Sequence, residues 1–320
     1  MKVLLLRKYQ GCYATILLIM FSFLLSVYTS TASSTNEQVI MVVGYDGTRW
    51  NPYIAPLAAG KKLKPKSWKK IKSISNPVSI TRQSETGDFF VKKDNGKVVR
   101  YQSNDKSKLT EIPLPALQSD KINYTQLRAY SGGALAVKLY EGKSRQTEII
   151  NITPDSNNAS AIVNQAAAQF HPLQTKNSLF YGHVSCRLAC DPVIQEVWRH
   201  DLISGKTRQL TLLNSTAYLH SVDPNEHFAY LSSNQSGYYH LARLDLSSGQ
   251  IDWLTQGQVT DSVPSVSSSE DLYFIRRDAQ GTRLLRLQSV ATLAVTDNKF
   301  EEIPLPKNIK KIRYLEISDQ

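Results

Sequence analysis

Apolar and polar residues alternate over short runs through most of the chain that follows residue 37. Three of these runs combine a short apolar stretch with polar turn residues, namely "GDFFVKKDNG" at 87–96, "HFAYLSSNQSG" at 227–237 and "DLYFIRRDAQG" at 271–281. Each run ends in Gly, Asn, Asp or Ser and is followed by a second alternating run, which is typical of antiparallel hairpins. The sequence therefore predicts an all-β fold in which helices are almost absent.

The hairpins belong to a longer repeat. "HDLISGKTRQLT" at 200–211 and "LDLSSGQIDWLT" at 244–255 carry the same Asp-Leu-x-Ser-Gly and Leu-Thr elements, 44 residues apart. Four strands are expected in each period, and four strands per about 40–45 residues are typical of a β-propeller blade. Five such units fit between about residues 77 and 306, and the identical "EIPLP" at 111–115 and 302–306 marks the fourth strand of two of them.

A sixth unit is split between the two ends of the sequence. "IKKIRYLEISDQ" at 309–320 resembles the first strand of a blade, "QVIMVVGYDG" at 38–47 the second, and "TRWNPYIAPLAAG" at 48–60 the third and its exit. We therefore predict a single domain over 38–320, a six-bladed β-propeller closed by a blade shared between the N- and C-termini. Such closure leaves no open sheet edge. A two-domain β-sandwich does not explain a half-motif at each end.

The repeat resembles the WD40-like units of TolB-type periplasmic propellers. The likeness rests on Asp-Leu-x-Ser-Gly, Leu-Thr and the stretch Pro264-x-x-Ser-x-Ser-Glu-Asp-Leu-Tyr-Phe, and it covers about residues 38–320. It implies the propeller fold and leaves the partner open. The usual Ser-Pro-Asp-Gly turn survives only in altered forms such as "DPNE" at 223–226, and Gln38 already begins a blade, which leaves no room for the α/β domain that precedes the TolB propeller.

Residues 1–32 have the composition of a secretory signal. Three cations precede the uncharged apolar run at 14–27, and small residues follow up to Ala32, which predicts cleavage before Ser33 and export to the periplasm. The alternative is an uncleaved anchor between Tyr9 and Tyr28. Residues 1–32 contain no acid, so their removal lowers the net charge from +11 to +8.

Two cysteines remain after cleavage, Cys186 and Cys190. Disulfides persist in exported proteins, so we predict that this pair is bridged. A structural metal site normally needs four convergent Cys or His ligands, and this pair has no second Cys pair. No Gly-x-Ser-x-Gly occurs anywhere, which argues against an attached α/β-hydrolase-type peptidase. We assign no catalytic residue, metal or cofactor.

His171 in "QFHP" and His220 in "YLHS" occupy the same position of consecutive blades, in or just before the innermost strand. Two imidazoles at the central channel could bind a metal or an anionic ligand. The matching positions of other blades hold Pro264, about Leu127 and about Thr81, which add no metal ligand. We therefore expect a hydrogen-bonded channel lining in preference to a metal site.

Lysine dominates the segment "KKLKPKSWKKIK" at 61–72, which includes Lys61, Lys62, Lys64, Lys66, Lys69 and Lys70. A second cluster consists of Lys307, Lys310, Lys311 and Arg313. If both lie in connections from an outer strand to the next inner strand, they share one side of the disc with the channel histidines. Such a patch attracts an anionic partner, namely an acidic envelope protein, an anionic polysaccharide or lipid head groups. The alternative is a solvated loop that serves solubility.

The leading functional hypothesis is a non-enzymatic, monomeric, exported interaction module that binds a protein or another anionic envelope partner. Nucleic acid is excluded by export, and membrane contact is expected only if the N-terminal segment is uncleaved. The alternative is a lyase- or hydrolase-type propeller enzyme that acts on an anionic polysaccharide, with His171 and His220 near the reacting centre. That alternative requires one more His, Asp, Glu or Gln within reach of both imidazoles.

Overall fold

The computed structural model describes residues 38–58, 61–104, 108–114, 122–140, 147–153, 159–163, 165, 167–186, 193–290 and 300–319. Residues 1–37, which contain the predicted signal, lie outside the described residues. Within the described part, the single helical element is the short 3-10 helix η1 (Pro65–Ser67), and no helix there is long and apolar enough to cross a membrane.

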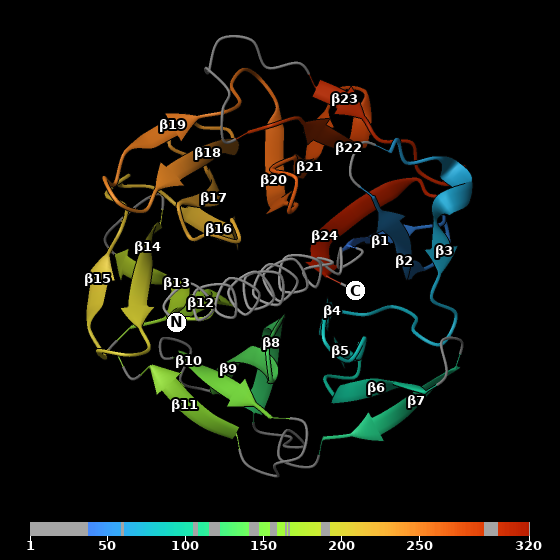
Figure 1. Cartoon of the computed structure of the whole chain (residues 1–320), viewed down its shortest axis with the longest axis horizontal. Coiled ribbons are helices and arrows are strands. Elements are labelled where there is room, and N and C mark those ends of the chain that lie inside the picture. The colour runs from blue at the N-terminus through green and yellow to red at the C-terminus, as the bar shows by residue number, and fades with distance from the viewer. Residues whose placement is uncertain are drawn as a thin grey trace, which may run out of the picture. The chain divides into compact units, whose positions relative to one another are not determined.

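Six four-stranded antiparallel sheets are arranged around a central channel (Figure 1). The six-bladed β-propeller predicted from the repeat is confirmed. Each blade begins with an inner strand at the channel and ends with an outer strand at the rim. The first two blades consist of β4 (Ser79–Arg82), β5 (Phe89–Lys92), β6 (Val98–Asn104) and β7 (Lys108–Pro113), and of β8 (Ile122–Tyr130), β9 (Gly133–Tyr140), β10 (Thr147–Ile152) and β11 (Ala159–Val163).

The next three blades repeat this plan. Their strands are β12 (Gln169–Gln174), β13 (Ser178–Cys186), β14 (Ile194–Asp201) and β15 (Thr207–Gln209); β16 (Ala217–Val222), β17 (Phe228–Ser233), β18 (His240–Asp245) and β19 (Ile251–Trp253); and β20 (Thr260–Val266), β21 (Leu272–Asp278), β22 (Gly281–Leu287) and β23 (Phe300–Glu302).

The sixth blade combines strands from distant parts of the sequence. Its order is β24 (Lys311–Asp319), β1 (Gln38–Tyr45), β2 (Trp50–Leu57) and β3 (Lys69–Lys70). β24 and β1 are antiparallel and in register over most of their length, with Val39 opposite Ser318 and Val43 opposite Tyr314. The red and blue ends of the colour range therefore meet in one sheet (Figure 1).

The core lies between neighbouring blades, and β1 shows why its sequence is apolar without interruption. Ile40 and Val42 pack against the fifth blade, whereas Met41 and Val43 pack against the first. Successive side chains of a strand point to opposite faces, so a strand between two blades buries both faces. Edge strands at the rim are buried on fewer sides and carry more polar residues.

Hydrogen bonds of single residues explain the repeated Asp-Leu-x-Ser-Gly. The Asp201 carboxylate accepts backbone N–H groups of Ile203 and Ser204 at 3.1 and 2.7 Å, and Asp245 accepts those of Ser247 and Ser248 at 2.8 and 2.9 Å. The glycine that follows has a positive φ in both copies, 68° and 77°, which favours Gly. The motif is therefore a turn between the third and fourth strands.

The repeated Leu-Thr has a different role. The hydroxyl oxygens of Thr211 and Thr255 accept the backbone N–H groups of Val197 and Leu241, each at 2.9 Å. Both threonines are buried. Each one therefore secures the end of an outer strand to the third strand of its blade.

The two sides of the propeller are named from the direction of the inner strands. The six inner strands begin at the entry side and end at the exit side. Because the strands of a blade alternate in direction, the connection from an outer strand to the next inner strand lies at the entry side. The connection from a third strand to a fourth strand lies at the exit side.

This geometry corrects one expectation about the lysine-rich segment. Residues 61–68 connect the third strand β2 to the fourth strand β3, so the segment is not a link between blades. The sequence reasoning missed β3, because two lysines give no apolar alternation. Leu63 and Trp68 are buried and anchor the segment against the neighbouring blade, where the Trp68 indole N–H donates to the Pro304 carbonyl at 3.0 Å.

Candidate functional site

Five of the six inner strands carry a β-bulge, namely β8, β12, β16 and β20, and also β24, whose pairing with β1 shifts between Tyr314 and Ile312. The pairing with the second strand shifts between Thr125 and Arg128 in β8, between Phe170 and Leu173 in β12, and at the corresponding places of β16 and β20. Gln126, His171 and Val263 occupy these bulges with φ values of 52°, 53° and 54°. A bulge turns a side chain out of the regular alternation, so residues here can point into the channel.

A cavity of about 250 Å³ lies at these bulges, and inner-strand residues of all six blades line it. The cavity belongs to the entry-side half of the channel, since Val78 and Ser79 at the start of β4 border it. Its lining is mixed, with apolar side chains such as Leu219 and Val263 beside a small set of polar ones. The polar lining residues are Ser79, Thr125, Gln126, Arg128, His171, His220 and Tyr314.

His171 is held by Gln126 of the preceding blade. The Gln126 carbonyl Oε1 accepts the His171 backbone N–H at 2.6 Å, and the Gln126 Nε2 lies 3.3 Å from His171 Nε2. Because the amide orientation is set by the first bond, Nε2 of Gln126 donates and the ring Nε2 accepts. The His171 proton is therefore on Nδ1. Burial lowers the pKa of His171 to about 4, so the ring is neutral at neutral pH.

His220 lies next to His171 on the following blade, with ring centroids 6.1 Å apart. Burial lowers its pKa well below the usual value, and the positive forms of His171 and Arg128 lower it further. The Ser232 hydroxyl is 3.3 Å from the His220 Nε2. The structure thus brings together the two histidines predicted from the repeat, as a neutral pair.

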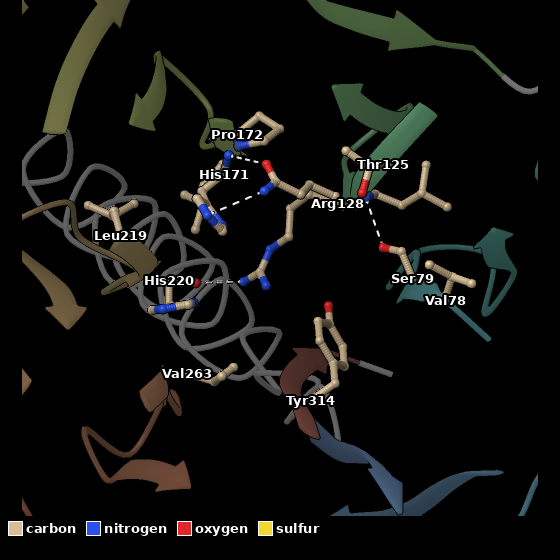
Figure 2. Close-up of a pocket in the computed structure, with 13 residues that line it drawn as sticks. Val78, Ser79, Thr125, Arg128, His171, Pro172, Leu219, His220, Val263 and Tyr314 are labelled. Atoms are coloured by element: carbon tan, nitrogen blue, oxygen red, sulfur yellow. Dashed lines mark hydrogen bonds between the residues drawn. The ribbon is translucent and has the colours of Figure 1, made fainter. Parts of the chain in front are cut away.

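Arg128 is the cation of this cavity. Figure 2 shows its side chain extending into the channel between His220 and Tyr314, and its Nη2 donates to the His220 backbone carbonyl at 2.9 Å. Burial acts to lower the pKa of Arg128, while Tyr314 and Glu316 raise it on balance. Arg128 is half-buried and borders the cavity.

Glu316 lies behind Arg128, toward the exit side. Its carboxylate accepts the Thr81 hydroxyl at 3.0 Å, the Arg82 backbone N–H at 3.3 Å and the Tyr314 hydroxyl. The first bond joins the sixth blade to the first. Glu316 borders a second cavity of about 280 Å³ in the exit-side half, which Arg82, Tyr130 and Ser318 also line. Arg128 borders both cavities, so it stands at the partition between them.

The predicted basic residues do not form one patch. Lys61, Lys62, Lys64 and Lys66 are exposed in the β2–β3 connection, which leaves β2 at the exit side. Lys62 pairs there with Glu301 of the fifth blade at 3.2 Å. Lys307, Lys310 and Lys311 are exposed at the entry side, between β23 and β24. The expectation that both clusters share one side is wrong, because the lysine-rich segment precedes an outer strand.

Three other predicted basic residues also belong to the sixth blade. Lys69 is exposed in β3, whereas Lys70 is half-buried and lies 3.6 Å from the Asp46 carboxylate. The Arg313 guanidinium stacks 4.4 Å above the Trp50 ring and donates to the Pro77 carbonyl. Arg313 therefore joins the sixth blade to the segment before the first.

The predicted disulfide lies outside the described residues, since Cys190 and the Cys186 side chain are not among them. It stays a prediction.

Within the described residues there is no group of three or more His, Cys, Asp or Glu side chains arranged to hold a metal ion. The two histidines make their hydrogen bonds with different residues. Gln126 contacts the His171 ring, whereas Ser232 contacts the His220 ring and Arg128 donates to the His220 backbone carbonyl.

Sequence reasoning found the histidines and missed Gln126, Arg128 and Tyr314. It matched His171 with Leu127 and Pro264, whereas the structural equivalents at the bulges are Gln126 and Val263. Each bulge adds one residue to its strand, so a comparison by regular spacing is displaced by one position. Arg128 and Tyr314 could have been predicted from the sequence. The stretches "QLRAY" and "KIRYLEI" place polar residues in strands expected to line the channel.

No protein-family model matches the chain, and no curated protein sequence matches it. Solved structures do match in fold. TolB from Acinetobacter baumannii is 14% identical over 93% of this chain and 70% of its own, with a TM-score of 0.67. An oligogalacturonate lyase in complex with manganese is 12% identical over 82% and 81%, with a TM-score of 0.55. A Mycobacterium tuberculosis puromycin-hydrolyzing peptidase is 11% identical over 84% and 54%, with a TM-score of 0.51. At these identities the likeness is one of fold, the six-bladed propeller of TolB.

Proposed function

We propose that the protein is a non-enzymatic, exported interaction module whose entry side binds an acidic protein of the cell envelope. The observation that carries this proposal is the position of three exposed lysines, Lys307, Lys310 and Lys311, on the side that opens toward the cavity of Arg128 and the two histidines. Periplasmic location and cleavage before Ser33 are part of the proposal. The fold shared with TolB supports a scaffold role in general terms.

Electrostatics favours the entry side over the lysine-rich segment as the binding surface. The exposed lysines before β24 lie on the same side of the propeller as the cavity that Arg128 lines, so an acidic partner on this side would meet charges of one sign. Such a surface attracts an acidic partner and speeds its association. The lysines at 61–66 instead lie at the exit side, and Lys62 pairs there with Glu301.

The opposite positions of the two clusters allow a matched test. One variant carries Lys307→Ser, Lys310→Ser and Lys311→Ser, and the other carries Lys61→Ser, Lys64→Ser and Lys66→Ser, so that each loses three charges. Envelope proteins are captured on both variants and on the wild type, the captured protein is purified, and its Kd is measured at two salt concentrations. We expect the first variant to bind roughly tenfold or more weakly, and high salt to weaken the wild type in the same direction.

If the two variants lose the same affinity for the captured protein, or if all three proteins bind it equally, the entry side is not the binding surface. Capture of anionic lipid vesicles or acidic polysaccharide with no acidic protein would replace the protein partner with that ligand. Both variants should keep wild-type thermal stability to within about 0.5 kcal/mol, because the substituted side chains are exposed.

A second candidate function rests on the neutral imidazole pair. His171 and His220 could serve a carbohydrate-active enzyme of the kind suggested by the fold shared with an oligogalacturonate lyase in complex with manganese. The test is incubation of the protein and of a His171→Gln variant with polygalacturonate and Mn²⁺, followed by ultraviolet absorbance of unsaturated products. Product from the wild type alone would favour this function over the binding module.

A further inference from the structure

We infer that the entry-side cavity is a seat for a single carboxylate, with Arg128 as its charged receptor and His171 as a neutral hydrogen-bond donor. The inference deepens the proposed function, since it names the chemical group of the partner that enters the channel. The seat is built from side chains of different blades, and so it depends on the folded ring.

The charge in the cavity selects an anion over a cation. Arg128 is the charged residue among those that line the entry-side cavity, and both imidazoles beside it are neutral. A metal ion placed between the imidazoles would meet the positive guanidinium. An anion there would be attracted in surroundings of low dielectric constant, where the interaction is stronger than in water.

The donors of Arg128 are sufficient for a ligand. A guanidinium has five N–H donors in a planar fork that matches a carboxylate. The His220 carbonyl takes one of them, and Tyr314 and the Glu316 carboxylate also interact with the group. Glu316 accepts from Thr81, Arg82 and Tyr314 and borders the exit-side cavity, whereas Arg128 also lines the entry-side cavity and can be reached from there.

The tautomer of His171 adds a second donor. Because Gln126 donates to the ring Nε2, the ring proton is on Nδ1, and the ring is fixed by both contacts with Gln126. A neutral imidazole that presents N–H can donate to a carboxylate oxygen without adding charge. Gln126 is therefore a positioning residue. The bulges of β8 and β12 place Gln126 and His171 at the cavity.

The size and lining of the cavity restrict the ligand further. A cavity of about 250 Å³ suits a small ligand or a single side chain of a partner. The cavity has a single cation, Arg128, and the negative charge of nearby Glu316 opposes a second charge on the ligand. A monoanion is therefore favoured over a phosphate dianion. Leu219, Val263 and Val78 suit a short carbon chain. A glutamate side chain of a partner and a free short-chain acid share this chemistry.

The experiment uses the folded chain and four probes, namely butyrate, its neutral isostere butyramide, inorganic phosphate, and a capped tetrapeptide with one glutamate. Calorimetry gives each Kd, and nuclear magnetic resonance follows the imidazole signals of His171 and His220. We expect butyrate to bind with a Kd on the order of millimolar, and butyramide and phosphate to bind at least tenfold more weakly. Tighter binding of the tetrapeptide than of butyrate would assign the seat to a protein-borne carboxylate, and the reverse would assign it to a free acid.

Two cavity variants and one control test the assignment. Arg128→Gln should weaken butyrate at least tenfold, whereas Arg82→Gln, which removes a cation of the exit-side cavity, should not. If Arg128→Gln fails to fold, Val78→Trp replaces it, because Val78 is 49% exposed at the mouth of the cavity and a larger side chain there obstructs entry. Equal binding of butyrate and butyramide, or equal losses in Arg128→Gln and Arg82→Gln, would overturn the inference. Loss of partner capture in the entry-side lysine variant with intact butyrate binding would affect the proposed function alone.

Discussion

At the scale of single residues, the channel histidines show how burial sets charge. His171 lies among Gln126, Tyr218, His220 and Arg128, and its ring centroid is 4.6 Å from that of Tyr218. None of these neighbours offers a negative charge to an imidazolium. The low pKa therefore follows from burial, and the protein keeps a neutral imidazole at the channel, where the sequence alone predicted a hydrogen-bonded lining in preference to a metal site.

This pKa has a consequence for stability. In the unfolded chain His171 titrates near 6.5, and in the folded protein near 4, so the unfolded state binds more protons between these values and stability falls as the pH is lowered through this window. The wild type should lose about 1–2 kcal/mol more than a His171→Gln variant between pH 7 and pH 5. Urea unfolding at both pH values measures this difference. Parallel losses in the two proteins would mean that His171 is not held neutral.

At the scale of elements, the two clearest copies of the repeat, 200–211 and 244–255, differ in the hydrogen bonds of their threonine. Thr211 and Thr255 both accept a third-strand N–H, but Thr211 also donates to the Glu196 carboxylate at 2.5 Å. Glu196 is 1% exposed and also accepts the Asn214 backbone N–H at 2.8 Å. A buried acceptor that loses a donor is costly, so the same motif has a larger energetic role in the third blade than in the fourth.

Valine substitutions test this difference directly. Thr255→Val leaves one N–H without its acceptor and should destabilise the protein by about 1–3 kcal/mol. Thr211→Val should cost more, because it also removes a donor from buried Glu196. Thr211→Ser and Thr255→Ser keep the hydroxyl and serve as controls close to the wild type. Urea midpoints rank the four variants, and equal costs of the two valine substitutions would show that the Glu196 bond contributes nothing.

The same scale shows what sequence could and could not predict. Short apolar strands bounded by turn residues, such as 272–278, and turns with Asp and Gly were predictable, because their hydrogen bonds are made with neighbouring segments of the chain. The strand at Lys69–Lys70 was not, since it is defined by its partners in β2 and not by its own pattern. The bulges at Gln126 and His171 were also invisible, because one added residue leaves the period of the neighbouring segments unchanged. Those bulges position the candidate site.

At the scale of the whole molecule, the sixth blade joins the two ends of the propeller domain. β24 forms its inner strand, and Ile312 and Leu315 are buried in the cluster shared with the fifth blade. Glu316 bonds to Thr81 of the first blade, and the Ser265 hydroxyl of the fifth accepts the Ile317 N–H at 3.0 Å. One strand thus contacts both neighbouring blades, so its loss is expected to affect packing beyond its own sheet.

A chain that ends after Pro306 tests this dependence on β24. Without the inner strand, β1 becomes an open edge and two inter-blade interfaces lose their partner, so we expect loss of cooperative unfolding and association through the exposed edge, and not a slightly weakened monomer. The matched control is Leu315→Ala in the full chain, which removes core packing at a cost of about 2–5 kcal/mol but keeps the ring. Circular dichroism, size-exclusion chromatography and urea unfolding compare the two proteins, and a peptide of residues 307–320 added in trans should restore the truncated one. A monomeric truncated chain that unfolds as cooperatively as the Leu315→Ala variant would show that five blades and an incomplete sixth are stable without β24, and that the contacts to Thr81 and Ser265 are dispensable for closure.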